Sequence, residues 1–230
     1  MFNLLKLELK RFHFSFKFLI TLICNIVILG IVSLIFFAEK DSFGTDFESF
    51  SVLLQLALSI ISITFMVFSG VLISSMITSE YKNKTIMLLY TYPISRKKLL
   101  LSKLLLIFLF TFFSMIFSAF FIFFVFYGIL YLTNSLFFTL TVDIFSKIAI
   151  VALTSSLKNS VIALIPIAFG IKTKSIPATI ISGFLIAGFL HSNFNGFNFS
   201  SILLIPLIFI ILSILIIYFI ISNADNKDIN

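Results

Sequence analysis

Long apolar stretches without a charge alternate with short polar segments along this chain. No residue between Lys17 and Glu39 is charged, and Phe18–Phe37 would form a helix about 30 Å long, enough to cross the hydrocarbon core of a bilayer. Applied to the whole chain, the pattern predicts six membrane-spanning helices at residues 18–37, 51–77, 104–132, 136–157, 176–190 and 202–221. We therefore expect an all-α integral membrane protein, with residues 1–230 forming a single membrane domain.

The fourth predicted helix has two alternative registers. The favoured register, Leu136–Leu157, contains Asp143 and Lys147, which lie four residues apart on one helical face in the order that favours pairing. The alternative, Ile148–Ile171, moves these two residues to the rim but leaves Lys158 near the middle of the membrane. We favour the first because a buried ion pair costs less than a buried lone cation. Asp143 and Lys147 are thus expected to form either a structural ion pair or an intramembrane polar site.

The composition agrees with a membrane protein and excludes several other classes. The chain is 60% apolar, only 11% of its residues are charged, and its mean hydropathy is +1.22, so it lacks the polar surface of a soluble domain. The single cysteine, Cys24, excludes an intramolecular disulfide framework and a cysteine metal cluster. No paired carboxylates, histidine cluster or Ser–Lys dyad is visible, so we expect neither catalytic residues nor a metal site.

The positions of the cations predict the orientation in the membrane. All of the sixteen Lys and Arg residues except Lys40 and Lys147 fall on the side of the predicted membrane that holds the N-terminus. Cytoplasmic loops are enriched in these residues, so both termini are expected in the cytoplasm and the chain in the plasma membrane. The net charge of +7 is then explained by the inner lipid surface, and we expect no binding to nucleic acid.

The N-terminal residues 1–16 have an amphipathic pattern. Apolar residues recur at steps of three and four, and the cations fall on another side. The apolar positions are Phe2, Leu5, Leu9, Phe12 and Phe16. This pattern predicts a helix that lies in the inner lipid interface before the first span.

The segment between the second and third spans, residues 78–103, carries apolar residues where a cytoplasmic loop is normally polar. Ile86–Tyr90 would form one or two helical turns of apolar and aromatic surface, and Pro93 would stop that helix. Ser95 is a suitable N-cap for a new helix that continues through Lys103 into the third span. An exposed apolar helix of this kind is what a cytoplasmic partner with a groove would bind.

The spacing within this segment resembles that of a known family. The segment contains, in this order, Glu80, Thr85, Leu88, Leu89, Pro93, Ser95, Arg96 and Lys103. This order resembles the motif after the second span of ABC-2 type transporter permeases, a family that includes small six-span subunits of bacterial antimicrobial-peptide export and immunity systems. The resemblance extends to the amphipathic N-terminus, the six-span plan and the polar step Ser155–Ser160 after the fourth helix. The chain departs from the family at Lys84, where glycine often stands.

The resemblance implies a mechanical role rather than a catalytic one. The segment 78–103 would contain the coupling helix that docks on a cytoplasmic ABC ATPase subunit. That subunit would bind ATP and Mg. This chain has no phosphate-binding loop in its sequence and is expected to bind no cofactor. A second permease chain, identical or different, would complete the path through the lipid bilayer. Glu80 would orient the coupling helix, Leu88, Leu89 and Tyr90 would fill a groove of the ATPase, and Arg96 and Lys103 would bind lipid phosphate or ATPase carboxylates.

Two functions are compatible with these features. In the first, the chain is the permease of an exporter that moves an antimicrobial or amphipathic peptide or a lipid-like molecule outward. Candidate path-lining residues are the polar residues of the second helix, Gln55, Ser59 and Ser62. In the second, the chain is a non-transporting immunity factor or scaffold that uses residues 78–103 to recruit a cytosolic partner.

Overall fold

The computed structural model describes residues 14–38, 47–82, 96–132, 142–194, 197–198 and 204–222. This part of the chain is all-helical except for one antiparallel pair of two-residue strands, in which Asn193 lies opposite Asn198. The elements are α2 (Phe14–Ala38), α3 (Phe47–Ile73), the π-helix η1 (Ser74–Thr78), α4 (Ser79–Lys82), α6 (Arg96–Leu132), α7 (Val142–Ile162), α8 (Pro166–Thr173), α9 (Ile176–His191), β1 (Asn193–Phe194), β2 (Phe197–Asn198) and α10 (Leu204–Ser222).

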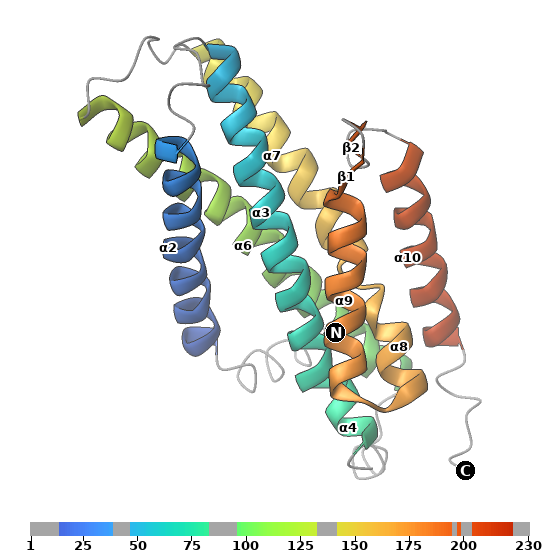
Figure 1. Ribbon diagram of the computed structural model, residues 1–230. Helices are drawn as coiled ribbons and strands as arrows, with labels where there is room; N and C mark the ends of the chain where they lie inside the picture. The colour runs from blue at the N-terminus through green and yellow to red at the C-terminus, as the bar shows by residue number, and fades with distance from the viewer. Residues whose placement is uncertain are drawn as a thin grey trace.

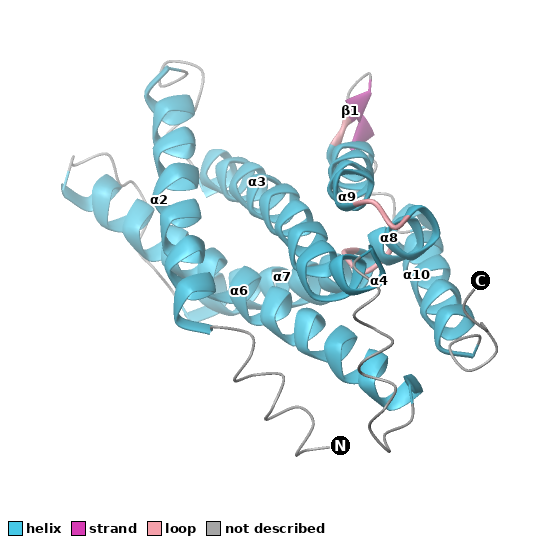
Figure 2. Cartoon of the chain, turned by 90° about the horizontal axis from the view of Figure 1, so that it is seen from below, coloured by secondary structure: helices cyan, strands magenta, loops and turns pink. Residues whose placement is uncertain are grey.

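Helix α3 occupies the centre of the bundle. Figure 1 shows α2 on one side of α3, with α8, α9 and α10 on the other, and Figure 2 shows the same order from below. Helix α9 packs chiefly along α3, and α6 crosses behind both α2 and α3. We call the end that carries α4 the lower end and the opposite end, where α6 ends and α7 begins, the upper end.

Five helical segments of the described residues are long and apolar enough to cross a membrane. They are Phe16–Ala38, Val52–Lys82, Lys97–Ile129, Phe145–Thr173 and Leu204–Ser222. Helix α9 coincides with the predicted span 176–190, but its 16 residues give a length of about 24 Å, less than the hydrocarbon core of about 30 Å. The chain is therefore a multi-pass membrane protein with five candidate spans, and the structure does not establish the predicted number of six.

The fourth span differs from both predicted registers. Helix α7 starts at Val142 and ends at Ile162, and the apolar segment continues through α8. The polar step Ser155–Ser160, expected after this helix, lies inside it. The helix tolerates the step because its hydroxyls bond to carbonyls of the same helix: Ser155 Oγ donates to Val151 O at 2.7 Å.

A break separates α7 from α8. Pro166 has no N–H to donate to the preceding turn, and around it the backbone hydrogen bonds shorten to a three-residue spacing, which leaves the Ala163 carbonyl without a backbone donor. Ser69 Oγ of α3 donates to this carbonyl at 2.9 Å, and Ser213 Oγ of α10 donates to the Val161 carbonyl at 2.7 Å. Neighbouring helices therefore stabilise the break, as a membrane environment requires.

Helices α3 and α9 approach closely because glycines lie where they cross. A Cβ atom on Gly70 would lie 3.3 Å from the Thr179 carbonyl oxygen, and one on Gly183 would lie 3.5 Å from the Met66 carbonyl oxygen. Small residues at a crossing let two backbones touch without the cost of displaced side chains. The contact ties α9 to the central helix.

Several predicted segments end at other residues or fall outside the described part. Helix α6 begins at Arg96 and continues through Lys103 into the third span, as the sequence predicts. Residues 1–13 of the predicted interfacial helix lie outside the described residues, and residues 14–16 belong to α2. Helix α10 agrees closely with the predicted span 202–221.

Candidate functional site

The candidate site is the lower end of the bundle, where the chain leaves the second span and enters the third. Helix α4 ends at Lys82 and α6 begins at Arg96, so these two helix ends flank residues 83–95. The segment predicted to bind a cytoplasmic partner thus starts and finishes on described helices. The contacts between those helices decide how firmly the segment is anchored.

A buried ion pair joins the two flanking helices. Glu80 of α4 and Lys103 of α6 form a salt bridge, and Lys103 Nζ also donates to the Met76 carbonyl oxygen of η1 at 3.3 Å. The side chain of Lys103 is only 2% exposed and that of Glu80 only 8%. Two charges buried together in this way hold a defined geometry, because removal of either leaves the other unpaired in a low-dielectric site.

The position of Lys103 on α6 shows why it needs a partner. Leu100, Leu104 and Ile107 share its buried face of α6 and belong to the apolar core of the lower end. A lysine on such a face would normally extend its ammonium group to water, but here the group is enclosed. Glu80 therefore supplies the countercharge that lets α6 pack against α4.

A π-helical turn immediately precedes Glu80. Residues Ser74–Thr78 form η1 between α3 and α4, with Ile73 and Ser79 in α-helical geometry on either side. Ile77 and Thr78 are buried in this turn, and its Met76 carbonyl accepts the hydrogen bond from Lys103. A π-helical turn inserts extra backbone into a helix and is often found at functional sites.

The structure brings together two of the predicted coupling residues and describes few of the others. Glu80 and Lys103 bind each other, so Lys103 does not point toward lipid phosphate or a partner as expected; its burial against Glu80 prevents this. Arg96 is the first residue of α6, but its side chain lies outside what the structure describes. The predicted coupling residues outside the described part are Thr85, Leu88, Leu89, Tyr90 and Pro93.

The predicted intramembrane pair is not resolved as a contact. Asp143 lies in the first turn of α7, with its side chain outside the described part, and Lys147 is exposed on the same helix. The interaction of Asp143 with Lys147 remains a prediction.

The three candidate path-lining residues have different surroundings. Gln55 is exposed, and Ser59 Oγ donates to the Gln55 carbonyl at 2.9 Å within α3. Ser62 is buried, donates to the Leu58 carbonyl at 2.7 Å, and accepts a hydrogen bond from Asn159 Nδ2 of α7 at 2.6 Å. Ser62 therefore links two helices, which is a structural role that sequence reasoning did not assign.

Sequence reasoning also missed a second group of polar contacts at the lower end. Thr78 Oγ1 and Thr179 Oγ1 lie 3.2 Å apart, 101 residues apart in the chain, and Gly170 packs against both. The signal available in the sequence was a threonine inside an apolar stretch, and such a residue equally well bonds to its own helix. Among the described residues, no three His, Cys, Asp or Glu side chains gather to form a metal site.

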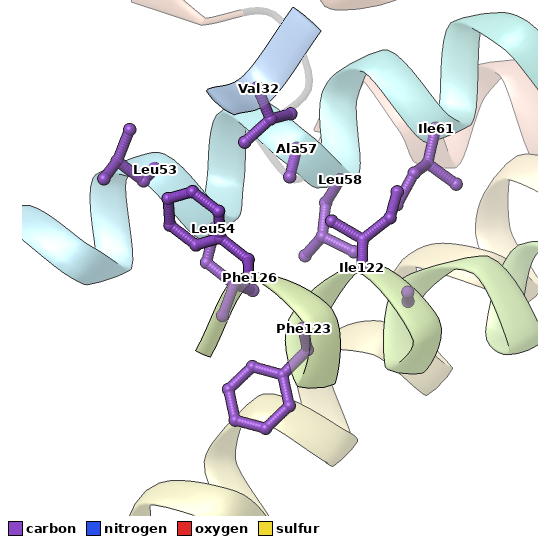
Figure 3. Close-up of a pocket in the computed structure, with 10 residues that line it drawn as sticks. Val32, Leu53, Leu54, Ala57, Leu58, Ile61, Ile122, Phe123 and Phe126 are labelled. Carbon is purple, nitrogen blue, oxygen red and sulfur yellow. The ribbon is translucent and has the colours of Figure 1, made fainter. Parts of the chain in front are cut away.

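The upper end contains an apolar cavity instead of polar contacts. Figure 3 shows side chains of α2, α3 and α6 around it, among them Val32, Ala57 and Ile122. The cavity has a volume of about 20 Å³ and an almost entirely apolar lining. A space of this size and character offers a water molecule no polar partner.

Comparisons with known proteins indicate the family of the chain. Residues 4–188 match the model of a family described as "ABC-2 family transporter protein". The chain is 35% identical over 226 residues to "Uncharacterized protein YcbO" of Bacillus subtilis (strain 168), covering 98% of this chain and 99% of that protein. No solved structure matches the chain. Members of the ABC-2 permease family are membrane transport components that normally work with an ATPase subunit. This chain belongs to the ABC-2 family of transporter proteins.

Proposed function

We propose that the chain is the membrane-spanning permease subunit of an ATP-driven ABC-2 exporter. A separate cytoplasmic ATPase subunit binds ATP and Mg, and this chain converts movement of that subunit into movement of membrane helices. The cargo is an antimicrobial or amphipathic peptide or a lipid-like molecule, carried outward for export or self-immunity. The lower end of the bundle faces the cytoplasm of the cell, together with both chain termini.

The buried ion pair between Glu80 and Lys103 is the observation that carries the proposal. It anchors both ends of residues 83–95 to each other through α4 and α6. A segment that receives force from a partner transmits it only if the helix ends that flank it keep their relative position. We call the ion pair between Glu80 and Lys103, which joins these helix ends, the base of the segment. A buried, paired charge resists displacement. The proposal therefore assigns the ion pair to force transmission into α3 and α6.

The residues between the two anchors have the chemistry to bind an ATPase groove. Leu88, Leu89 and Tyr90 are apolar or aromatic, with Lys84 before them and Arg96 after them. An apolar helical turn fits a hydrophobic groove, and neighbouring cations give it orientation. Closure of the ATPase subunits would then displace the base as one body.

A second permease chain would cover helices that are poorly buried within one chain. In the described part, only 11% of the most apolar stretch of α10 and 22% of that of α2 are buried within the chain. The corresponding share is 50% for the spans that contain α3, α6 and α7. Lipid or another chain must cover the remaining surface. The proposal assigns part of it to a second copy or a homologous permease that completes the path.

Association with the ATPase tests the proposal directly. The tagged Leu88→Asp/Leu89→Asp variant should still insert in the membrane but should no longer co-purify with the ATPase in mild detergent. The reason is that charged side chains do not bind an apolar groove. Leu88→Met/Leu89→Met is the matched control, since it keeps the apolar volume and should retain the ATPase. Equal ATPase recovery from the Asp and Met variants would contradict the coupling role.

Transport distinguishes an exporter from a non-transporting scaffold. Vesicles that contain this chain and its ATPase should move an amphipathic peptide or a lipid in an ATP-dependent manner. That movement should stop when the ATPase is made inactive. A scaffold would retain the ATPase through residues 83–95 but show no ATP-dependent movement of either class of cargo.

A further inference from the structure

The π-helical turn η1 is connected to the turn between α8 and α9 by a chain of hydrogen bonds. Thr179 Oγ1 donates to the Ser175 carbonyl at 3.0 Å, so its single proton is already used. Thr78 must therefore be the donor in its 3.2 Å hydrogen bond with Thr179. The chain runs from Thr78 in η1 through Thr179 in α9 to Ser175 in the turn.

Gly170 allows these hydroxyl groups to meet. A Cβ atom on Gly170 would overlap with Thr78 Oγ1 and would lie 2.7 Å from Thr179 Oγ1. Any residue other than glycine at this position of α8 would force the two threonines apart. Thr78, Thr179 and Gly170 are all buried, so no water competes for the contact. We call these three residues the threonine lock.

The turn that receives the contact is short and closed by a backbone hydrogen bond. Lys174 adopts a left-handed conformation with φ of 52°, and its N–H donates to the Gly170 carbonyl at 3.0 Å, which ends α8. Pro177 lies in the first turn of α9. A displacement of Gly170 or Thr179 therefore moves α8 and the start of α9 together.

The threonine lock lies directly beside the ion pair between Glu80 and Lys103. Thr78 is the last residue of η1, two residues before Glu80, and Met76 of the same turn accepts the hydrogen bond from Lys103. One π-helical turn therefore contacts both α6 and the α8–α9 pair. Figure 2 shows α4 and α8 as neighbours at the lower end.

From these contacts we infer that the threonine lock carries the movement of the coupling segment into α8 and α9, so that α9 moves with the lower end of α3. This inference rests on the proposed function and identifies positioning residues for it. The glycine crossing at Gly70 and Gly183 extends the same contact higher along α3 and α9. Without the lock, η1 would keep its hydrogen bond to α6 and lose its polar connection to α9.

Distances between spin labels test the inference in the assembled complex of this chain with its ATPase. Labels are placed at Leu19 of α2 as a reference, at Lys82 of α4 and at Lys172 of α8, all of them exposed, in a Cys24→Ala background. ATP should change the Leu19–Lys82 and Leu19–Lys172 distances to a similar extent. In Thr78→Val/Thr179→Val, which keeps side-chain volume but removes both hydroxyls, the first change should persist and the second should fall by at least half.

A steric variant tests the same contact independently of the hydroxyls. Gly170→Ala should reduce ATP-dependent transport at least fivefold while ATPase turnover and ATPase recovery stay within twofold of the unmodified complex. Gly188→Ala is the matched control, because a Cβ on Gly188 of α9 meets nothing within 4 Å. Thr78→Ser, which keeps the hydroxyl, should restore most of the transport lost in Thr78→Val.

The outcomes separate the inference from the function on which it rests. If ATP changes the Leu19–Lys82 distance and the Thr→Val variant leaves the Leu19–Lys172 change intact, the lock does not carry the movement, although the permease function stands. If ATP changes neither distance in the unmodified complex, the proposed function fails, and the inference fails with it. A Gly170→Ala variant that transports as well as Gly188→Ala would also overturn the lock.

Discussion

The two ends of the bundle both have an apolar core, but they differ in the polar contacts between helices. At the lower end, helices are joined by directional polar contacts: Glu80 with Lys103, and Thr78 with Thr179. At the upper end, α2, α3 and α6 meet through apolar and aromatic side chains, such as Phe36 and Phe126 with ring centroids 5.5 Å apart, and leave a small cavity. Polar contacts add a directional requirement to the packing that apolar contacts alone do not impose. Under the proposed function, these polar contacts would hold the geometry of the end that receives force from the ATPase.

Breaking the ion pair should have the largest effect on this comparison. Lys103→Met leaves the Glu80 carboxylate buried without its partner, and it should lower the free energy of unfolding by about 3–5 kcal/mol. Thermal unfolding in detergent measures the change. The exposed Lys98→Met on the same helix is the matched control and should change stability by less than about 0.5 kcal/mol.

Two double variants sharpen the result. Glu80→Met/Lys103→Met removes both charges and should recover most of the lost stability, because no unpaired charge remains. The exchanged pair Glu80→Lys/Lys103→Glu restores two opposite charges at this position. It should recover part of the ATP-dependent transport that the single Lys103→Met variant loses. A single Lys103→Met variant as stable as Lys98→Met would contradict the buried pair.

Removing a polar contact between two helices should have an intermediate effect. Ser69→Ala leaves the Ala163 carbonyl at the α7–α8 break without its donor and should cost about 0.6–2 kcal/mol, measured as a lower unfolding temperature. Ser33→Ala on α2 is the control, since Ser33 Oγ only bonds to the Gly30 carbonyl of its own helix. Equal effects of the two substitutions would mean that α3 does not stabilise the break.

Filling the upper cavity should have the smallest effect. Val32→Ile adds one CH2 group to the cavity lining and should raise stability by no more than about 0.8 kcal/mol, with transport unchanged. Val71→Ile adds the same group on an exposed position of α3 and should leave the unfolding temperature unaltered. A large loss of stability in Val32→Ile would show that the upper end is packed as specifically as the lower end.

The break at residues 163–165 shows how far the sequence predicts local structure. Pro166 predicts an interruption, because proline lacks the N–H that the preceding turn needs. The sequence does not predict that the apolar segment continues past it as α8, because this depends on Ser69 and Ser213 from helices far away in the chain. For the same reason, the sequence predicts that the polar step Ser155–Ser160 follows the fourth helix, whereas the structure has it inside α7.

Glu80 and Lys103 mark the limit at the candidate site. Both were selected from the sequence because of their spacing in segment 78–103, yet Lys103 was expected to face outward. Its pairing depends on where α6 passes the end of α4, and a spacing pattern along one chain carries no information on that crossing. The threonine lock joins residues 101 apart for the same reason and escaped detection altogether.

The sequence by itself determined that the chain is an all-helical membrane protein, because burial of apolar side chains in lipid depends only on the local run of residues. It also indicated the interruption at Pro166 and the segment that carries the family's pattern. Only the tertiary structure decided which buried polar side chain meets which, since that choice follows from the angles and heights at which helices cross. The ion pair between Glu80 and Lys103 is a product of those crossings.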